Sequence, residues 1–404
     1  MATIQQLKDH LEKNNDIAYA FSEGLKTART YNIPQLIPIK TVADLIDYYE
    51  EFLTWIPSEN KAGDKVYNRL CLFYFVLDCA PLSSFQTPIL PSSSAPWTWL
   101  SNWIINYALE LGSFLNTQES LTSASLQTFY DAAEYNPTGY TMTEDYGAIG
   151  EQTWLTFNQF FARSLISPDR RPIDSLLDDT IIVSPADSTF DGSWDIDNNA
   201  DVTFEGNIIS KGLTWSITEL LQDSEYGPQF AGGKFAHAFL SPANYHRQHA
   251  PVAGEVKEAK MIHGQCYLQV VAQPDDENEG KSKFGMIRKW RNDRNQRRVP
   301  SERDSLDAPD APGYQFLQSR AIIIIDNPTL GLVAVLPMGM CQVSSVVLEC
   351  KAGDTLTKGK EISYFQFGGS DIVLVFQKDA NVTFTAELDT LYRVGKQIAT
   401  SPTK

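Results

Sequence analysis

The chain has 404 residues, 43% of them hydrophobic and 11% aromatic, which is enough to form the cores of two or three domains. Its formal net charge of -17 argues against nucleic acid or an anionic membrane surface as a partner, because both would repel it. Five cysteines without a Cys-x-x-Cys pair are typical of reduced thiols. Since neither a signal peptide nor an apolar run of spanning length is found, the sequence predicts a cytoplasmic protein.

The first third of the chain has the patterns of helices. Residues 1–134 are predicted to form a helical domain, because segments 41–56 and 65–80 repeat apolar residues three and four positions apart. Segment 95–115 has aromatic residues on more than one face, which predicts a buried helix. Residues 135–152 mix Asn-Pro, glycine and polar residues, and we interpret them as a linker.

The remaining residues, 153–404, are predicted to form a second, β-rich domain. Beyond residue 180, short β-branched runs alternate with Gly, Asp and Pro, as in a sandwich or barrel. Segments 250–264 and 347–365 resemble one another weakly, which favours an internal duplication. The predicted fold class is therefore α+β, with a helical domain followed by a β-rich sandwich or barrel-like domain.

A charged insertion interrupts the β-rich domain. Residues 274–280 are acidic, residues 281–303 are densely basic, and residues 303–313 are acidic again. Such blocks usually form a solvated loop. The alternative is a lid over a pocket, with the basic residues contacting a carboxylate or a phosphate.

Two of the five histidines, His246 and His249, lie close together in SPANYHRQHAPVAG. Their spacing of three suits two metal ligands on a helix, but Pro242 and Pro251 argue against a helix and a third ligand is lacking. We therefore predict no metal site. Two structural histidines, or an acid/base pair, are the remaining interpretations, because the pKa of histidine lies near neutrality.

Three further residues have both a structural and a chemical interpretation. Asp187 and Asp191, in VSPADSTFDG, end strand-like runs, where a carboxylate either forms a turn or orients a histidine. Ser370 follows two glycines in YFQFGGSDIVLVF, which is typical of a turn. The same arrangement also suits a serine that attacks its own backbone, because glycine leaves the preceding carbonyl uncrowded.

Together these segments resemble a known family. Residues 157–173, 183–188, 245–256 and 364–376 resemble, in order, four sequence blocks of the phosphatidylserine decarboxylase family, whose members are self-processing, pyruvoyl-dependent decarboxylases. The resemblance spans about residues 150–400. The helical N-terminal domain resembles the one carried by a soluble branch of that family, which includes fungal tryptophan decarboxylases.

The resemblance implies self-cleavage between Gly369 and Ser370. Ser370 Oγ would attack the Gly369 carbonyl, and elimination would convert Ser370 into a pyruvoyl group that forms a Schiff base with a substrate amine. By the same resemblance His249 is the base that activates Ser370, Asp187 orients His249, and His246 protonates the substrate carbon after carbon dioxide leaves. The cofactor is thus made from the chain itself, with neither PLP nor a metal.

The resemblance also assigns supporting roles and shows two departures. Tyr245, Arg247 and Gly368 are expected to bind substrate or support the site. Asp191 is a second candidate for the orienting acid, from the local sequence alone. The family's usual Gly-Ser-Thr ends here in Asp371, and a serine follows Asp187 where a glycine is usual. The fragments 1–369 and 370–404 are expected to stay together, because their strands belong to one sheet.

The expected substrate is a free aromatic L-amino acid such as tryptophan, from resemblance to the soluble branch. Phosphatidylserine, converted to phosphatidylethanolamine, is the alternative, but the acidic composition disfavours membrane association. An unprocessed scaffold or a carrier module is a further alternative. The sequence does not determine the oligomeric state.

Overall fold

The computed structural model describes all residues except 138–139, 205–212, 276–279, 287–312, 341–345 and 403–404. The first residues of the basic insertion form a strand, Ser282–Met286. The rest of the insertion, on which the loop or lid prediction depends, lies outside the described residues.

Helices form the first part of the chain, as the sequence predicts. The helices are α1 (Ala2–Lys13), α2 (Asn15–Arg29), α3 (Val42–Phe52), α4 (Lys65–Asp78), α5 (Trp99–Leu115), α6 (Ser123–Asp131), α7 (Met142–Tyr146), α8 (Phe157–Phe161) and α9 (Ile217–Leu220). Local sequence fixes their starts: Thr41 and Thr98 each accept a hydrogen bond from the backbone three residues on, which caps α3 and α5. The segment predicted to be a linker contains α7.

Strands dominate the rest, and the predicted α+β class is confirmed. They are β1 (Ile181–Val183), β2 (Ser188–Asp195), β3 (Asp201–Phe204), β4 (Leu213–Ser216), β5 (Lys234–Leu240), β6 (Arg247–His249), β7 (Gly254–Ile262), β8 (Val270–Pro274), β9 (Ser282–Met286), β10 (Arg320–Asn327), β11 (Gly331–Met340), β12 (Val346–Leu348), β13 (Thr355–Leu356), β14 (Glu361–Phe365), β15 (Gly369–Phe376), β16 (Thr383–Phe384), β17 (Thr390–Tyr392) and β18 (Gln397–Thr400).

The main sheet has eight strands in the order β13-β7-β10-β11-β15-β5-β2-β17, with antiparallel pairing throughout. Its central strands are buried on both faces, which is why 321–325 reads as an unbroken apolar run. Two three-stranded sheets, β1-β18-β16 and β12-β14-β6, accompany it. The echoing segments 250–264 and 347–365 pair with one another through β13 and β7, while the duplication itself stays a prediction.

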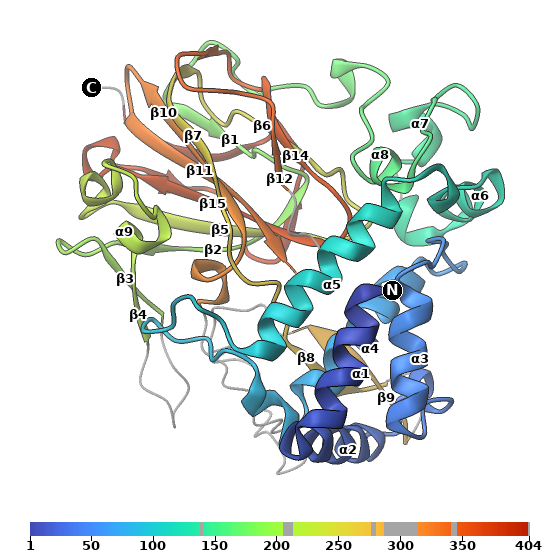
Figure 1. Cartoon of the computed structure of the whole chain (residues 1–404). Coiled ribbons are helices and arrows are strands. Elements are labelled where there is room, and N and C mark those ends of the chain that lie inside the picture. Colours follow the sequence, from blue (N-terminus) through green and yellow to red (C-terminus); the bar gives the residue numbers. More distant parts are fainter. Residues whose placement is uncertain (138–139, 205–212, 276–279, 287–312, 341–345, 403–404) are drawn as a thin grey trace.

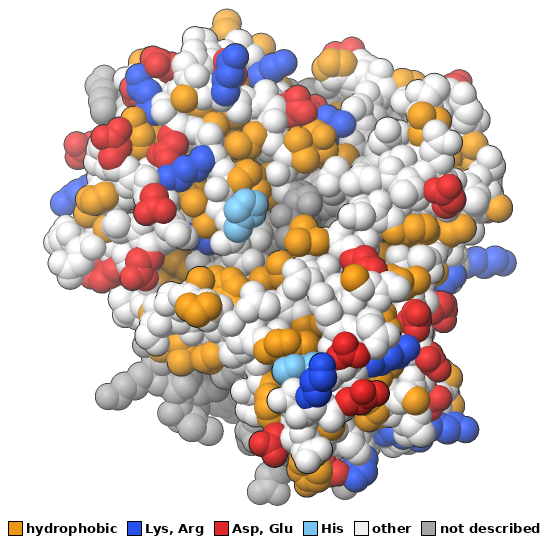
Figure 2. Space-filling model, viewed as in Figure 1, with side chains coloured by type: hydrophobic (Ala, Val, Ile, Leu, Met, Phe, Trp, Pro, Cys, Tyr) orange, Lys and Arg blue, Asp and Glu red, His pale blue; other side chains and the backbone are white. Residues whose placement is uncertain are grey.

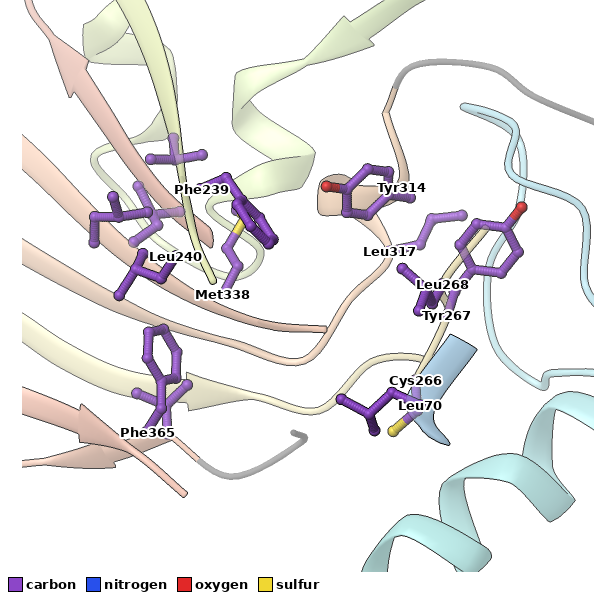
Figure 3. Packing of buried hydrophobic residues seen from close by; sticks show 14 of the residues in the cluster. Leu70, Phe239, Leu240, Cys266, Tyr267, Leu268, Tyr314, Leu317, Met338 and Phe365 are labelled. Carbon is purple, nitrogen blue, oxygen red and sulfur yellow. The ribbon is translucent and has the colours of Figure 1, made fainter. Parts of the chain in front are cut away.

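The helical region packs against the strands rather than standing apart. In Figure 1, α1 to α4 gather at one side of the molecule, and α5 runs between them and the strands. Helix α4 packs on β8 and β9, and Tyr74 donates a hydrogen bond to the Cys266 carbonyl. Figure 3 shows Leu70 of α4 beside Cys266, at one end of a buried apolar cluster. The domain boundary at residue 134 stays a prediction.

The surface agrees with the acidic composition. Figure 2 shows acidic side chains spread over both the strand-rich and the helical parts of one face, with basic side chains interspersed. Among the described residues, no helix combines the length and apolar character that crossing a bilayer requires.

Asp78, at the end of α4, joins the helices to the strands. It is buried, and its carboxylate accepts hydrogen bonds from the Val270 backbone and the Gln86 side chain, at 2.9 and 3.0 Å. We expect Asp78→Ala to lower the free energy of unfolding by about 3 kcal/mol, because two buried donors lose their acceptor. Denaturant unfolding measures this, with the exposed Asp47→Ala as control. Equal stability of both variants would contradict the proposed junction.

Candidate active site

Ser370 lies near the start of β15, in the middle of the main sheet. Its backbone pairs with Gly339 of β11 on one side and Leu240 of β5 on the other, and the residue is fully buried. Gly368, just before the strand, has a φ of 140°, a conformation that a residue with a Cβ adopts only with strain. The chain therefore enters β15 through a glycine-dependent bend, and the predicted cleavage site lies where the bend meets the strand.

His246 is the histidine that contacts Ser370. Its Nδ1 lies 3.3 Å from Ser370 Oγ, and its Nε2 lies 3.2 Å from the Pro242 carbonyl oxygen. A carbonyl only accepts, so Nε2 carries the proton and Nδ1 is left to accept from the serine hydroxyl. Burial, aided by the charge of Arg163, lowers the pKa of His246 to about 3, so the ring is neutral. Phe161 stacks on it, with ring centroids 3.9 Å apart.

Arg163 holds the loop that positions His246. It is buried, and its Nη2 donates to the carbonyls of Ala243 and Asn244, at 2.7 and 2.8 Å. These residues follow Pro242, whose carbonyl fixes the imidazole tautomer. Arg163 lies within the segment 157–173 that resembles the family, but its sequence context does not distinguish it from a surface arginine.

His249 lies away from Ser370. Its Nδ1 lies 2.8 Å from the Gly359 carbonyl oxygen, and its Nε2 lies 3.0 Å from the Tyr245 hydroxyl. Burial lowers its pKa. Among the described residues, no hydrogen bond joins His249 to Ser370 or Asp187. His246 and His249 are three residues apart, and side chains three apart on an extended backbone point to opposite faces. Only one of the two histidines can therefore face Ser370. The base role of His249 therefore stays a prediction that this geometry does not support.

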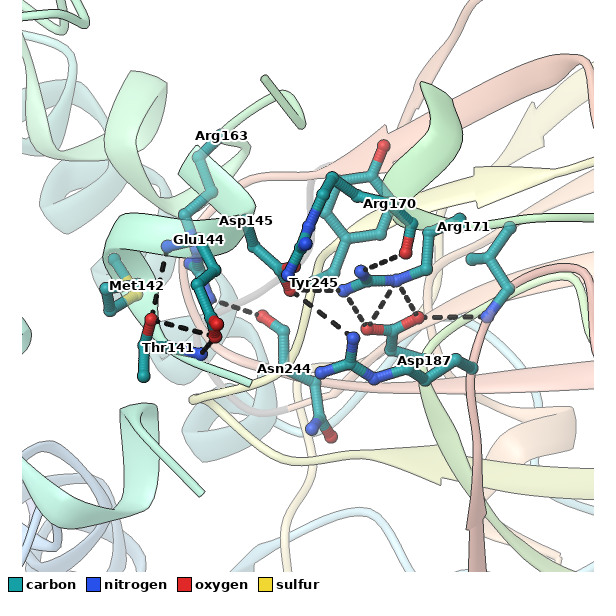
Figure 4. A network of polar contacts seen from close by, with 12 residues as sticks. Thr141, Met142, Glu144, Asp145, Arg163, Arg170, Arg171, Asp187, Asn244 and Tyr245 are labelled. Carbon is teal, nitrogen blue, oxygen red and sulfur yellow. Dashed lines mark hydrogen bonds and ion pairs between the residues drawn. The ribbon is translucent and has the colours of Figure 1, made fainter. Parts of the chain in front are cut away.

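Asp187 lies in a separate ion network (Figure 4). Both of its oxygens accept from Arg171, at 2.6 to 3.1 Å, and Oδ1 also accepts from the Val394 backbone at 2.9 Å. Arg171 binds Asp145 of α7 as well, and Arg393 lies 3.5 Å from Asp145. Burial disfavours the charge of Asp145, but its hydrogen bonds to Arg171 outweigh this and lower its pKa. The orienting role of Asp187 also stays a prediction.

Arg247 lies on β6, and Tyr245 lies in the loop before it. Arg247 donates to the Ala162 carbonyl at 2.7 Å, forms an ion pair with Glu361, and lies over the Tyr364 ring. It thereby joins α8, β6 and β14. Tyr245 contacts His249 as described, and its ring lies under the Arg171 guanidinium. These contacts suit a supporting role, while contact of either residue with substrate stays a prediction.

A second buried histidine, which the sequence analysis did not consider, lies near the cleavage site. His237 of β5 approaches Asp191 through Nδ1 at 2.8 Å and Asp371 through Nε2 at 3.5 Å. The Gln315 amide lies 3.1 Å from Nε2, and the Tyr314 hydroxyl donates to Asp371 Oδ2 at 2.9 Å. Burial alone lowers the pKa of His237, but the two carboxylates outweigh it and raise the pKa to about 9. Asp191 thus contacts His237 instead of His249.

Comparison with known proteins identifies the family. The family model for phosphatidylserine decarboxylase matches residues 157–400, which is more than half of the chain. This chain belongs to the phosphatidylserine decarboxylase family. The region matched contains Ser370, both histidines of the Tyr-His-Arg segment, and His237. The family resemblance found in the sequence is confirmed.

Individual relatives carry two kinds of name. Decarboxylase iboD of Amanita muscaria is 30% identical over 58% of this chain and 61% of its own length. Phosphatidylserine decarboxylase proenzyme 2 of rice is 29% identical over 62% of this chain and 35% of its own. L-tryptophan decarboxylase of Psilocybe cubensis is 24% identical over 60% of this chain and 52% of its own. In each case the match covers less than two thirds of the relative.

Members of this family are pyruvoyl-dependent, and several relatives are named proenzymes. The residues around Ser370 fit a group made from the chain, since a buried hydroxyl meets a neutral imidazole and a glycine bend precedes it. Within the part of the chain that the structure describes, no cluster of three His, Cys, Asp or Glu side chains is arranged to bind a metal ion.

The charge of His237 gives the fold a testable pH dependence. Because its pKa in the folded state exceeds the unfolded value, the stability it contributes is fully present below pH 6.5 and is lost as the pH rises through about 9. We expect His237→Gln to be less stable than wild type below pH 6.5, with a difference that shrinks towards pH 9. Thermal unfolding from pH 6 to 9.5 measures this, with the exposed His263→Gln as control. A difference that does not change with pH would contradict a charged His237.

Proposed function

We propose that this chain is a self-processing, pyruvoyl-dependent decarboxylase of a free amino acid, with an aromatic side chain as in tryptophan. The contact between Ser370 Oγ and the unprotonated Nδ1 of His246 carries the proposal. A neutral serine hydroxyl is a poor nucleophile unless a base accepts its proton, and here a base of fixed tautomer faces it. We also propose that the enzyme acts in the cytoplasm.

Self-processing proceeds through the residues around the start of β15. As Ser370 Oγ bonds to the Gly369 carbonyl carbon, His246 Nδ1 accepts the hydroxyl proton. The C–N bond then breaks as this proton passes to the peptide nitrogen, which leaves as an amine and gives an ester. Loss of the Ser370 Cα proton then expels the Gly369 carboxylate and leaves dehydroalanine. Water converts this to the pyruvoyl group and ammonia, with fragments 1–369 and 370–404 as products.

A pyruvoyl group supplies a carbonyl that binds the substrate amine and withdraws the electron pair left when carbon dioxide departs. The chain's own residues position it. Strands β5 and β11 hold the backbone at position 370 from both sides. Buried aromatic rings, with Phe161 stacked on His246 and Phe367 beside Phe161, exclude water on the His246 side. His246 lies on this same side, where the family resemblance expects it to return a proton to the substrate carbon.

A free aromatic amino acid is favoured over phosphatidylserine for two reasons. The chain carries a net charge of -17, which opposes approach to an anionic membrane. The relatives include one named L-tryptophan decarboxylase. Other relatives are named phosphatidylserine decarboxylases, so the phospholipid remains the second candidate. An uncleaved scaffold is the third.

The role of His246 as base is testable by comparing histidine variants. We expect His246→Ala to slow chain cleavage by about a hundredfold or more, because the proton acceptor of Ser370 is lost. His249→Ala should slow it less, since its contacts are with Tyr245 and Gly359. The time course of cleavage on denaturing gels measures both, with His263→Ala as control. Normal cleavage of His246→Ala and a block in His249→Ala would assign the base role to His249 instead.

The substrate proposal is tested by carbon dioxide release. We expect purified protein to decarboxylate tryptophan, with activity lost after borohydride reduction and absent in Ser370→Ala. Vesicles containing phosphatidylserine are the competing substrate. Release from the vesicles alone would establish the phospholipid as substrate, and a whole chain without activity on either would favour the scaffold.

A further inference from the structure

The two faces of β15 differ in chemistry at the cleavage site. Side chains alternate along a strand, so Ser370 and Asp371 point to opposite faces. On the Ser370 face lies the neutral His246 with its aromatic neighbours. On the Asp371 face lies the His237 cluster, which is formed by Asp371 itself, Asp191, His237, Tyr314 and Gln315.

The charges in the His237 cluster do not balance. Two carboxylates, Asp191 and Asp371, face one imidazolium, because the carboxylates raise the pKa of His237 to about 9. Asp371 is fully buried, with Oδ2 accepting from Tyr314, whereas Oδ1 has no hydrogen-bond partner among the residues that the structure describes. A buried acceptor without a partner is costly, so this oxygen is suited to accept from a donor on a bound molecule.

A substrate bound after cleavage would be attached to the residue next to Asp371 in the strand. The substrate amine bonds to the carbon that was Ser370 Cα, on the side from which Gly369 leaves. Positions 369 and 371 share one face of β15, opposite to the Ser370 side chain. A substrate side chain that points to this face therefore lies on the same side of the strand as Asp371.

We propose that Asp371 determines substrate specificity, with Oδ1 accepting a hydrogen bond from an N–H or O–H group, or from a cation, on the side chain of the substrate. This inference rests on the proposed function and narrows its substrate class. The indole N–H of tryptophan is such a donor. An anionic side chain, including the phosphodiester of phosphatidylserine, is disfavoured next to a cluster whose net charge is already negative.

The test compares amino acids that match in size but differ in the donor. The probes are tryptophan with naphthylalanine, tyrosine with phenylalanine, and lysine with norleucine, together with O-phosphoserine as a soluble anionic probe. We expect wild type to prefer the donor-bearing member of at least one pair by about tenfold or more in kcat/KM. Asp371→Asn should reduce that ratio by about tenfold and improve the relative rate with O-phosphoserine. Asp379→Asn, exposed just after the same strand, is the matched control.

Intact mass separates the possible failures. If the wild-type chain stays uncleaved, both the proposed function and this inference are wrong. A cleaved, active enzyme whose ratios are equal in wild type and Asp371→Asn overturns the inference alone. If Asp371→Asn does not fold or cleave, the double variant Asp371→Asn, His237→Gln removes one charge of each sign and is used for the same ratios. Unchanged ratios in that variant also overturn the inference.

Discussion

The double pairing of β15 is the constraint on which the rest of the site depends. Hydrogen bonds to β5 and β11 fix the backbone from Ser370 to Phe376, so the reactive residue cannot move away from its neighbours. The glycine-dependent bend at Gly368 directly precedes this strand. After cleavage between Gly369 and Ser370, residues 370–376 would keep seven paired residues with β5 and seven with β11. These pairings explain how a short C-terminal fragment would remain bound.

In the proposed function, proton transfer and substrate recognition take place on opposite faces of one strand. On one face, burial keeps His246 neutral, and Arg163 and the Pro242 carbonyl fix its environment and tautomer. On the other face, carboxylates keep His237 charged. The same residue type therefore has a pKa near 3 on one side of β15 and near 9 on the other. Desolvation prevails at His246, whereas at His237 the Coulombic attraction and hydrogen bonds of Asp371 and Asp191 together outweigh it.

The sequence predicted what depends on local pattern, and missed what depends on pairing between distant strands. Helical periodicity located α3, α4 and α5 closely. The family resemblance named Ser370, His246 and His249 as candidates with His249 as the base, whereas in the structure Ser370 contacts His246, and the roles of all three stay predictions. His237 gave no signal, because it is one histidine in an alternating strand and meets its carboxylates only through the register of β2, β5 and β15. Arg171 likewise gains its contact with Asp187 only in the folded chain.

The central claim is that Ser370 becomes the reactive group of the enzyme, and denaturing intact-mass analysis of the purified protein tests it most directly. The account predicts two chains, with the shorter one starting at position 370 in a pyruvoyl group and therefore lacking a free α-amine. A single chain of 45.2 kDa that persists after long incubation would contradict it.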